Sequence, residues 1–175
     1  MSNTSKRITT PFDDLTYKVI GCAMAVHRAL GPGYRENTYQ CDLAAHFSEA
    51  HLTFESQKHY EVFDSLNQEQ LIGYYIPDFV IEDTLVVEIK ALKEALKGID
   101  NGHLAQVIGY LAVTGFQIGL LINFSERSLV YRRILPPKNI TESTANGYSF
   151  LTGSGPKGIT NRDKPMSRYP FNPIL

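Results

Sequence analysis

The chain has 175 residues, of which 43% are hydrophobic, and its formal net charge is −1. This composition predicts one soluble globular domain, because no apolar run approaches the ~18 residues of a membrane span. Residues 1–5 lack the apolar stretch of a signal peptide. The two cysteines, Cys22 and Cys41, have no metal-binding spacing, so we expect free, buried thiols and a cytoplasmic location.

Charge is unevenly distributed along the chain. Residues 1–137 contain 12 Lys and Arg against 16 Asp and Glu, a net charge of −4. Residues 138–175 contain 5 against 2, a net charge of +3. Broad non-specific binding to nucleic acid depends on Lys and Arg that neutralise phosphates, so the acidic body excludes it. Any contact with nucleic acid must be local.

The first 50 residues predict two helices. The first is capped by Asp13 or Asp14 and ends at residues 31–33, Gly-Pro-Gly. Its apolar positions recur every three to four residues: Leu15, Val19, Ala23, Val26 and Leu30. The second covers about residues 36–49. Glu36 begins its apolar stripe and is therefore expected to point inward; the stripe continues through Tyr39, Leu43 and Phe47.

Five short strands and a third helix follow. We expect the helix over residues 103–113 and the strands over residues 59–63, 74–81, 85–90, 117–124 and 128–135. This order predicts an α/β fold with a mixed central sheet of four to five strands flanked by helices. The composition then changes after Pro137. We therefore divide the chain into a flexible N-terminus, one domain and a flexible C-terminal tail, over residues 1–11, 12–136 and 137–175.

Two acids and a lysine on adjacent strands are the most informative feature. Asp78 follows Pro77 and shares a strand face with Val80, since side chains alternate along a strand. Glu88 and Lys90 share a face of the next strand, two rises or roughly 6.6 Å apart. Mg²⁺ takes about six oxygen ligands and keeps several waters. We therefore expect Asp78 and Glu88 to hold Mg²⁺ or Mn²⁺, and Lys90 to orient or deprotonate the attacking water.

A structural alternative accounts for the same residues. In it, Asp78 starts a turn after proline, and Glu88 pairs with Lys90 on an exposed strand face. Against this alternative, Glu88 and Lys90 interrupt an otherwise apolar strand. Polar groups in such a position are costly unless they have partners.

Polar residues outside the strands extend the candidate site. Glu36 is predicted to be a third carboxylate, although the helix dipole alone also favours an acid at a helix start. Gln106 and Tyr110 share one helix face, and His103 stands one turn earlier on it. The alternative is that these three form the polar flank of an amphipathic helix. Lys93 is a candidate for contact with a phosphate, with a solvated surface position as its alternative.

Taken together, these segments resemble a known family. Residues 33–39 match the GxxExxY signature, and residues 26–33 have the sequence that typically precedes it. Pro77-Asp78, the strand at 86–92 and the segments 106–111 and 114–124 follow in the family's order. The resemblance covers about residues 12–135. Pro77 precedes the acid where many relatives have another residue. The proline brings this chain closer to the pattern of a wider superfamily.

GxxExxY proteins are similar to a branch of the PD-(D/E)xK nuclease superfamily. The resemblance implies a restriction-endonuclease-like core in which Asp78, Glu88 and Lys90 form the metal and catalytic set. Glu36 would be the helix-borne acid. The spacing of Gln106 and Tyr110 resembles a motif of RecB-like exonucleases that helps to position DNA and the active site. The resemblance does not extend to the C-terminal tail.

The sequence therefore predicts a Mg²⁺- or Mn²⁺-dependent nuclease that hydrolyses phosphodiester bonds in DNA, with RNA as the less favoured substrate. Lys90 would place an ammonium beside the scissile phosphate, and its pKa can drop on burial. Two alternatives stay open: a catalytically silent module that binds nucleic acid or protein, and an enzyme with a different substrate. Nucleic acid is the expected partner, a homodimer or a protein partner is left open, and no membrane partner is expected.

Overall fold

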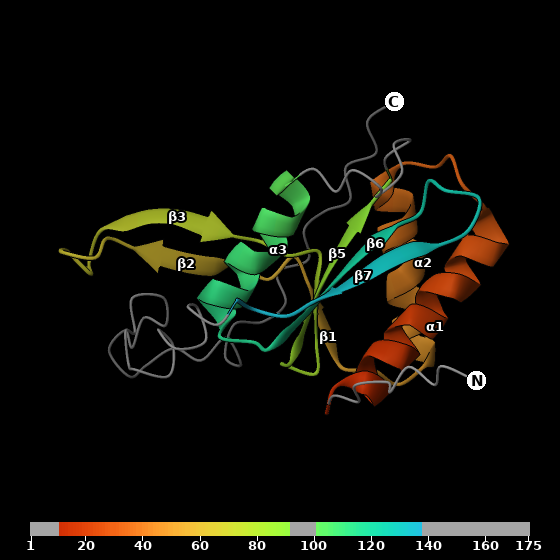
Figure 1. Cartoon of the computed structure of the whole chain (residues 1–175), viewed down its shortest axis with the longest axis horizontal. Coiled ribbons are helices and arrows are strands. Elements are labelled where there is room, and N and C mark those ends of the chain that lie inside the picture. The colour runs from red at the N-terminus through yellow and green to blue at the C-terminus, as the bar shows by residue number, and fades with distance from the viewer. Residues whose placement is uncertain (1–10, 92–100, 138–175) are drawn as a thin grey trace, which may run out of the picture.

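A computed structural model describes residues 11–91 and 101–137, apart from the side chain of residue 101. Within these ranges the chain forms three helices, a five-stranded sheet and a two-stranded hairpin (Figure 1). The predicted α/β fold, a mixed sheet flanked by helices, is confirmed. The N-terminal residues 1–10 and most of the predicted tail lie outside the described residues.

The helices are α1 (Asp13–Leu30), α2 (Glu36–Glu49) and α3 (Asn101–Thr114). All three lie close to their predicted ranges. The predicted cap of α1 is wrong, because Phe12 occupies the N-cap position and makes no side-chain hydrogen bond there. Asp13 and Asp14 instead lie within the first turn, where their charges complement the positive end of the helix dipole.

The central sheet has the strand order β1-β4-β5-β6-β7. The strands are β1 (Phe54–Ser56), β4 (Phe79–Ile81), β5 (Leu85–Lys90), β6 (Ile118–Asn123) and β7 (Val130–Ile134). β5 and β6 are parallel, and the other neighbours are antiparallel. Parallel neighbours require a crossover connection, and α3 lies between β5 and β6 in the chain. The carboxyl ends of β5 and β6 therefore lie at the same edge of the sheet.

The hairpin consists of β2 (Tyr60–Phe63) and β3 (Leu71–Tyr75), and it projects away from the central sheet (Figure 1). The predicted strand over 74–81 is wrong as a single element, because the chain leaves β3 at residue 75 and enters β4 only at residue 79. Pro77, between them, has no N–H to donate to a ladder. The predicted strand over 59–63 belongs to the hairpin, and the three-residue β1 was not among the predicted strands.

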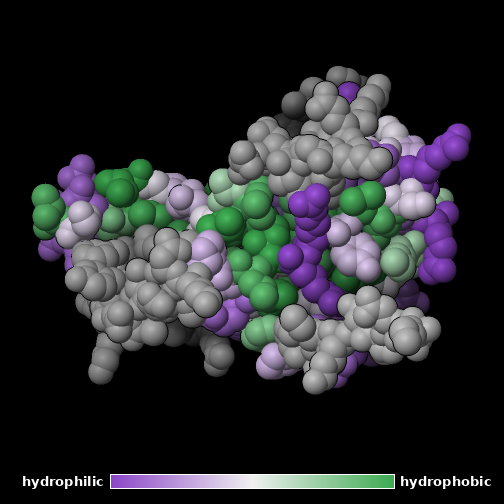
Figure 2. All heavy atoms as spheres, in the orientation of Figure 1, coloured by the Kyte–Doolittle hydropathy of each residue, from purple (hydrophilic) through white to green (hydrophobic). Residues whose placement is uncertain are grey.

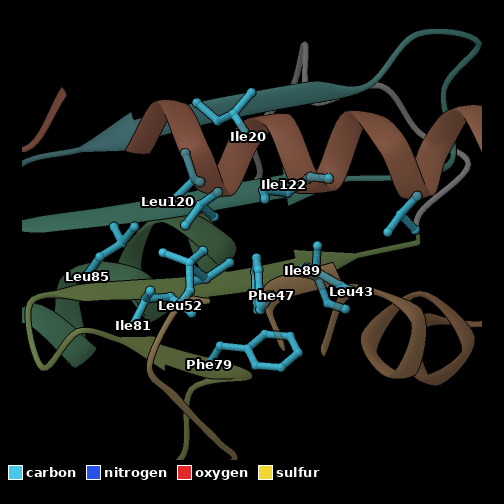
Figure 3. Close-up of a cluster of buried hydrophobic side chains, with 14 of the residues drawn as sticks. Ile20, Leu43, Phe47, Leu52, Phe79, Ile81, Leu85, Ile89, Leu120 and Ile122 are labelled. Carbon is cyan, nitrogen blue, oxygen red and sulfur yellow. The ribbon is translucent and has the colours of Figure 1, made fainter. Parts of the chain in front are cut away.

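Two apolar layers cover the two faces of the sheet. α1 and α2 pack on one face, where Ile20, Leu43 and Phe47 meet the side chains of β4, β5 and β6 (Figure 3). α3 packs on the other face through Val107 and Leu111, against residues such as Val86 and Leu121. Because side chains alternate along β5, Glu88 and Lys90 share the face of Val86, on the α3 side.

Gly119 in β6 lets α3 approach the sheet closely, because a Cβ added there would lie 2.5 Å from a methyl group of Val107. Apolar residues also lie on the surface along the hairpin and over α3 (Figure 2).

Cys22 and Cys41 are free, as predicted, but their predicted burial is wrong: Cys22 is half-buried and Cys41 is exposed on α2. In the described parts of the chain, the helices are too short or too polar to cross a bilayer.

Candidate active site

The antiparallel pairing of β4 with β5 brings the two strand acids together. Phe79 pairs with Val87, so the same register continued by one residue places Asp78 opposite Glu88. Oδ2 of Asp78 accepts a 2.8 Å hydrogen bond from the backbone N–H of Ile89. The carboxylate of Asp78 is therefore fixed beside the last residues of β5, as the sequence predicted.

Glu88 and Lys90 form a buried ion pair. Nζ of Lys90 donates a 2.5 Å hydrogen bond to Oε1 of Glu88, and the two side chains are 11% and 4% exposed, respectively. The alternative of a pair on an exposed strand face is thus wrong. Among the described residues, the buried second oxygen of Glu88, Oε2, has no hydrogen-bond partner. A buried carboxylate oxygen left in this way favours a nearby cation.

Asp78 is also electrostatically coupled to its neighbours. Burial, followed by the charge of Glu88 and a smaller effect of Glu36, raises the pKa of Asp78 to about 7. The hydrogen bond from Ile89 and the charge of Lys90 act in the opposite direction. Asp78 therefore competes with Glu88 for compensating positive charge.

The charges around Lys90 oppose the effect of its burial on its pKa. Burial alone lowers its pKa, but the hydrogen bond and charge of Glu88, together with the charges of Glu36 and Asp78, outweigh burial and raise the pKa. The lowering that burial can cause is therefore outweighed at Lys90. Lys90 is a fixed ammonium at neutral pH, suited to stabilising negative charge and unsuited to taking a proton from water.

Glu36 is the first residue of α2 and is half-buried. Its charge acts on both Asp78 and Lys90, so it belongs to the same electrostatic environment. Over residues 11–91 and 101–137, however, no three His, Cys, Asp or Glu side chains lie close enough together to hold a metal ion. The two strand acids are thus neighbours, and Glu36 does not complete a three-ligand cluster with them in this arrangement.

The residues nevertheless fit a hard divalent cation. Carboxylate oxygens are the ligands that Mg²⁺ prefers, and water commonly fills the rest of its coordination shell. Oε2 of Glu88 has no hydrogen-bond partner among the described residues, and the pKa of Asp78 is raised. Both observations indicate that the positive charge nearby does not fully compensate the two carboxylates. A divalent cation between the two acids would relieve both.

Gln106 and Tyr110 on α3 support the segment that precedes Asp78. Nε2 of Gln106 donates a 2.7 Å hydrogen bond to the hydroxyl of Tyr110, which donates a 3.1 Å bond to the backbone oxygen of Ile76. Burial, and then the charge of Glu88, raise the pKa of Tyr110. Tyr110 is buried and does not form a solvated polar flank, so the pair ties α3 to the approach of the acid site.

The other predicted contact residues are less closely tied to the acids. His103 is half-buried in the first turn of α3, and Lys93 lies outside the described residues. Two residues that were not among the predicted site residues hold the backbone oxygen of Asp78. The backbone N–H of Gln57 donates to it at 3.0 Å, and Nε2 of Gln40 at 3.5 Å. Gln40 stands one helical turn after Glu36, and that i, i+4 spacing was the available signal.

A family model described as the PD-(D/E)XK nuclease superfamily matches residues 13–134. The chain belongs to this superfamily. Pro77-Asp78 and Glu88-Ile89-Lys90 supply the residues in the superfamily's name, and the match ends at the last residue of β7. Membership places the protein among nucleases, a superfamily whose members generally use divalent metals.

Two solved structures are similar to this superfamily member. The protein of "Crystal structure of SSO0001" is 17% identical, with a TM-score of 0.49 and coverage of 79% of this chain and 68% of that one. An alkaline exonuclease, LHK-Exo from Laribacter hongkongensis, is 16% identical, with a TM-score of 0.41 and coverage of 74% of this chain and 84% of that one. No curated protein matches the sequence.

Proposed function

We propose that this protein is a Mg²⁺- or Mn²⁺-dependent nuclease of the GxxExxY branch, and that it hydrolyses phosphodiester bonds in DNA in preference to RNA. The observation that carries the proposal is the intact set of Asp78, Glu88 and Lys90. Asp78 lies opposite Glu88, and Glu88 holds the ammonium of Lys90, in a chain that belongs to a nuclease superfamily. A purely structural role gives no reason to gather two acids and a lysine in an apolar strand environment.

Asp78 and Glu88 would hold the metal ion, and Glu36 would add negative charge to the site from the start of α2. When bound, the ion would supply Lewis acidity and lower the pKa of a coordinated water. Asp78 can bind a metal ion only as the deprotonated carboxylate. Burial and the charge of Glu88 raise its pKa and so favour the protonated form. Metal binding should therefore be coupled to release of that proton.

Lys90 would place its positive charge beside the scissile phosphate. Its raised pKa supports a role as a charge stabiliser and argues against a role as the base. Its position is fixed by the ion pair with Glu88, so little reorganisation is required when negative charge develops on the phosphate. Gln106 and Tyr110 are positioning residues, because they act through the backbone of Ile76.

Cleavage of labelled oligonucleotides tests the proposal. Wild-type protein is incubated with DNA or RNA, each single- or double-stranded, in Mn²⁺, Mg²⁺ or a chelator. We expect metal-dependent cleavage by wild type and loss of cleavage in Asp78→Ala. Glu61→Ala, which removes an exposed acid on β2, is the matched control and should cleave like wild type. Equal cleavage by the Asp78 and Glu61 variants would contradict the assigned site.

A catalytically silent binding module is the second candidate. The acidic body, with a net charge of −4 over residues 1–137, favours it because such a body attracts nucleic acid poorly. A wild type that binds nucleic acid or a protein but cleaves no substrate with either metal would establish this alternative.

A further inference from the structure

Two exposed tyrosines immediately precede the two acidic segments of the candidate site. Tyr34, 51% exposed, lies two residues before Glu36, and Tyr75, 38% exposed, lies three residues before Asp78. Gln40, one turn after Glu36 on α2, donates a 3.5 Å hydrogen bond to the backbone oxygen of Asp78, so the two segments are neighbours in the fold. Tyr34 occupies an unspecified position of the GxxExxY signature, and Tyr75 lies before the Pro77-Asp78 motif.

Each exposed tyrosine is supported by a buried one in the same geometry. The ring of Tyr34 meets that of Tyr39 edge to face, with centroids 6.1 Å apart, and Tyr75 meets Tyr110 in the same way at 6.0 Å. The buried partners are themselves anchored: Tyr39 donates a 2.7 Å hydrogen bond to the backbone oxygen of Gly31, and Tyr110 donates its bond to the segment before Asp78. Both exposed rings are therefore held in place.

The tyrosines come from opposite sides of the sheet. Tyr39 belongs to the apolar layer under α1 and α2, and Tyr110 belongs to the layer under α3. Glu88 lies near the end of β5 on the face that α3 covers, and Asp78 is hydrogen-bonded to the neighbouring Ile89. On the α3 side the contact is close, because a Cβ added to Gly109 would lie 2.6 Å from the ring of Tyr75.

We propose that Tyr34 and Tyr75 are stacking residues for unpaired bases, and that the site acts on single-stranded nucleic acid in preference to a duplex. The inference rests on the proposed nuclease function. Flat aromatic faces bind the bases of a single strand without requiring a particular sequence, whereas a duplex hides those faces in its stack. An exposed guanidinium, that of Arg35, lies between Tyr34 and Glu36 in the chain and suits a local phosphate contact.

Charge supports the same choice of substrate. Duplex binding relies on many phosphate contacts from Lys and Arg, and residues 1–137 carry net negative charge. Two lysines near the acids or the hairpin already have carboxylate partners: Lys90 is bound to Glu88, and Lys58 to Glu55 at 2.5 Å. Stacking can supply affinity that this distribution of charge does not.

Binding in a chelator tests the inference separately from catalysis. Fluorescence anisotropy of a labelled thymidine oligonucleotide, alone or annealed to its complement, is measured with the full chain. We expect tighter binding of the single strand, and an increase in Kd of about ten-fold in Tyr34→Ala or Tyr75→Ala. Tyr34→Phe and Tyr75→Phe, which keep the ring, should bind like wild type. Tyr17→Ala is the control, since Tyr17 is 77% exposed on α1.

Duplex binding as tight as single-strand binding would overturn the inference. So would an equal loss in Tyr17→Ala, or unchanged Kd values in both alanine variants that melt like wild type. If Tyr34→Ala or Tyr75→Ala melts at a lower temperature than wild type, Tyr34→Trp or Tyr75→Trp tests stacking at that position. Wild-type affinity of the tryptophan variant supports stacking, and a loss of affinity contradicts it. The two proposals can fail separately. Single-strand binding without cleavage would contradict the proposed nuclease function. Cleavage at the wild-type rate in both alanine variants would contradict the stacking role of Tyr34 and Tyr75.

Discussion

The carboxylate of Asp78 accepts a 2.8 Å hydrogen bond from the backbone N–H of Ile89, the residue that separates Glu88 from Lys90. The bond joins Asp78, just before β4, directly to the Glu88-Ile89-Lys90 segment of β5. It also means that Asp78 serves two purposes, since one oxygen is used to fix the end of β5. Substitutions of Asp78 should therefore affect stability as well as chemistry.

Metal binding should stabilise the fold through Asp78. A cation that binds only the folded state raises the melting temperature by mass action. We expect Mn²⁺ or Mg²⁺ to raise the melting temperature of wild type and to have little effect on Asp78→Ala, measured by differential scanning fluorimetry. Glu61→Ala should respond like wild type. Equal shifts in all three proteins would show that the ions act elsewhere.

Stability in a chelator should depend on pH through Asp78. Its pKa of about 7 in the folded state lies above the usual value near 3.9, so between these values the folded state keeps a proton that the unfolded state has lost. The free energy of unfolding should therefore fall as pH rises from about 5 to about 7.5. Asp78→Asn cannot titrate and should show a shallower decline in urea unfolding. Identical pH slopes in the two proteins would contradict the raised pKa.

The hydroxyl of Tyr110 should contribute to stability. Tyr110→Phe removes its bond to Ile76 and leaves the amide of Gln106 without that partner, which should cost about 1 kcal/mol of unfolding free energy. Tyr131→Phe, at a more exposed position on β7, should cost less. Chemical denaturation measures both changes. If Tyr110→Phe is as stable as Tyr131→Phe, the tie between α3 and the acid segment is not needed for stability.

Residues after the sheet should be dispensable for folding. The family match ends at residue 134, and Ile134 is the last buried apolar residue of the described chain. We expect a chain that lacks residues 139–175 to remain soluble and to melt within a few degrees of the full chain, as measured by circular dichroism. Aggregation, or a much lower melting temperature, would show that the removed segment contributes to the fold.

The sequence predicted the helices and the pairing of Asp78 with Glu88 because both depend on periodic patterns. The apolar stripe through Tyr39 sets the inward face of α2, and alternation along β5 places Glu88 and Lys90 together. These signals are local. They required no knowledge of how distant segments pack.

The missed features depend on tertiary contacts. β1 is only three residues long and exists through its pairing with β4. The sequence could not show that β3 pairs with β2 in a separate hairpin and does not join the central sheet. The direction of the pKa of Lys90 depends on tertiary contacts in the same way. Burial alone predicts a lower value, and the opposite result follows from the ion pair with Glu88 and the neighbouring acids.

The most direct test of the proposed nuclease site is the cleavage rate of Lys90→Ala. Loss of a positioned charge beside the reacting phosphate should reduce the rate by about 100-fold or more, roughly 3 kcal/mol. Lys90→Arg should not restore activity, because a planar guanidinium places its charge differently. Lys58→Ala is the matched control: it removes another lysine paired with a glutamate, but two residues after the end of β1. We expect metal-dependent cleavage in wild type and Lys58→Ala and its loss in Lys90→Ala. Cleavage by Lys90→Ala at the wild-type rate would rule out Lys90 as the charge stabiliser.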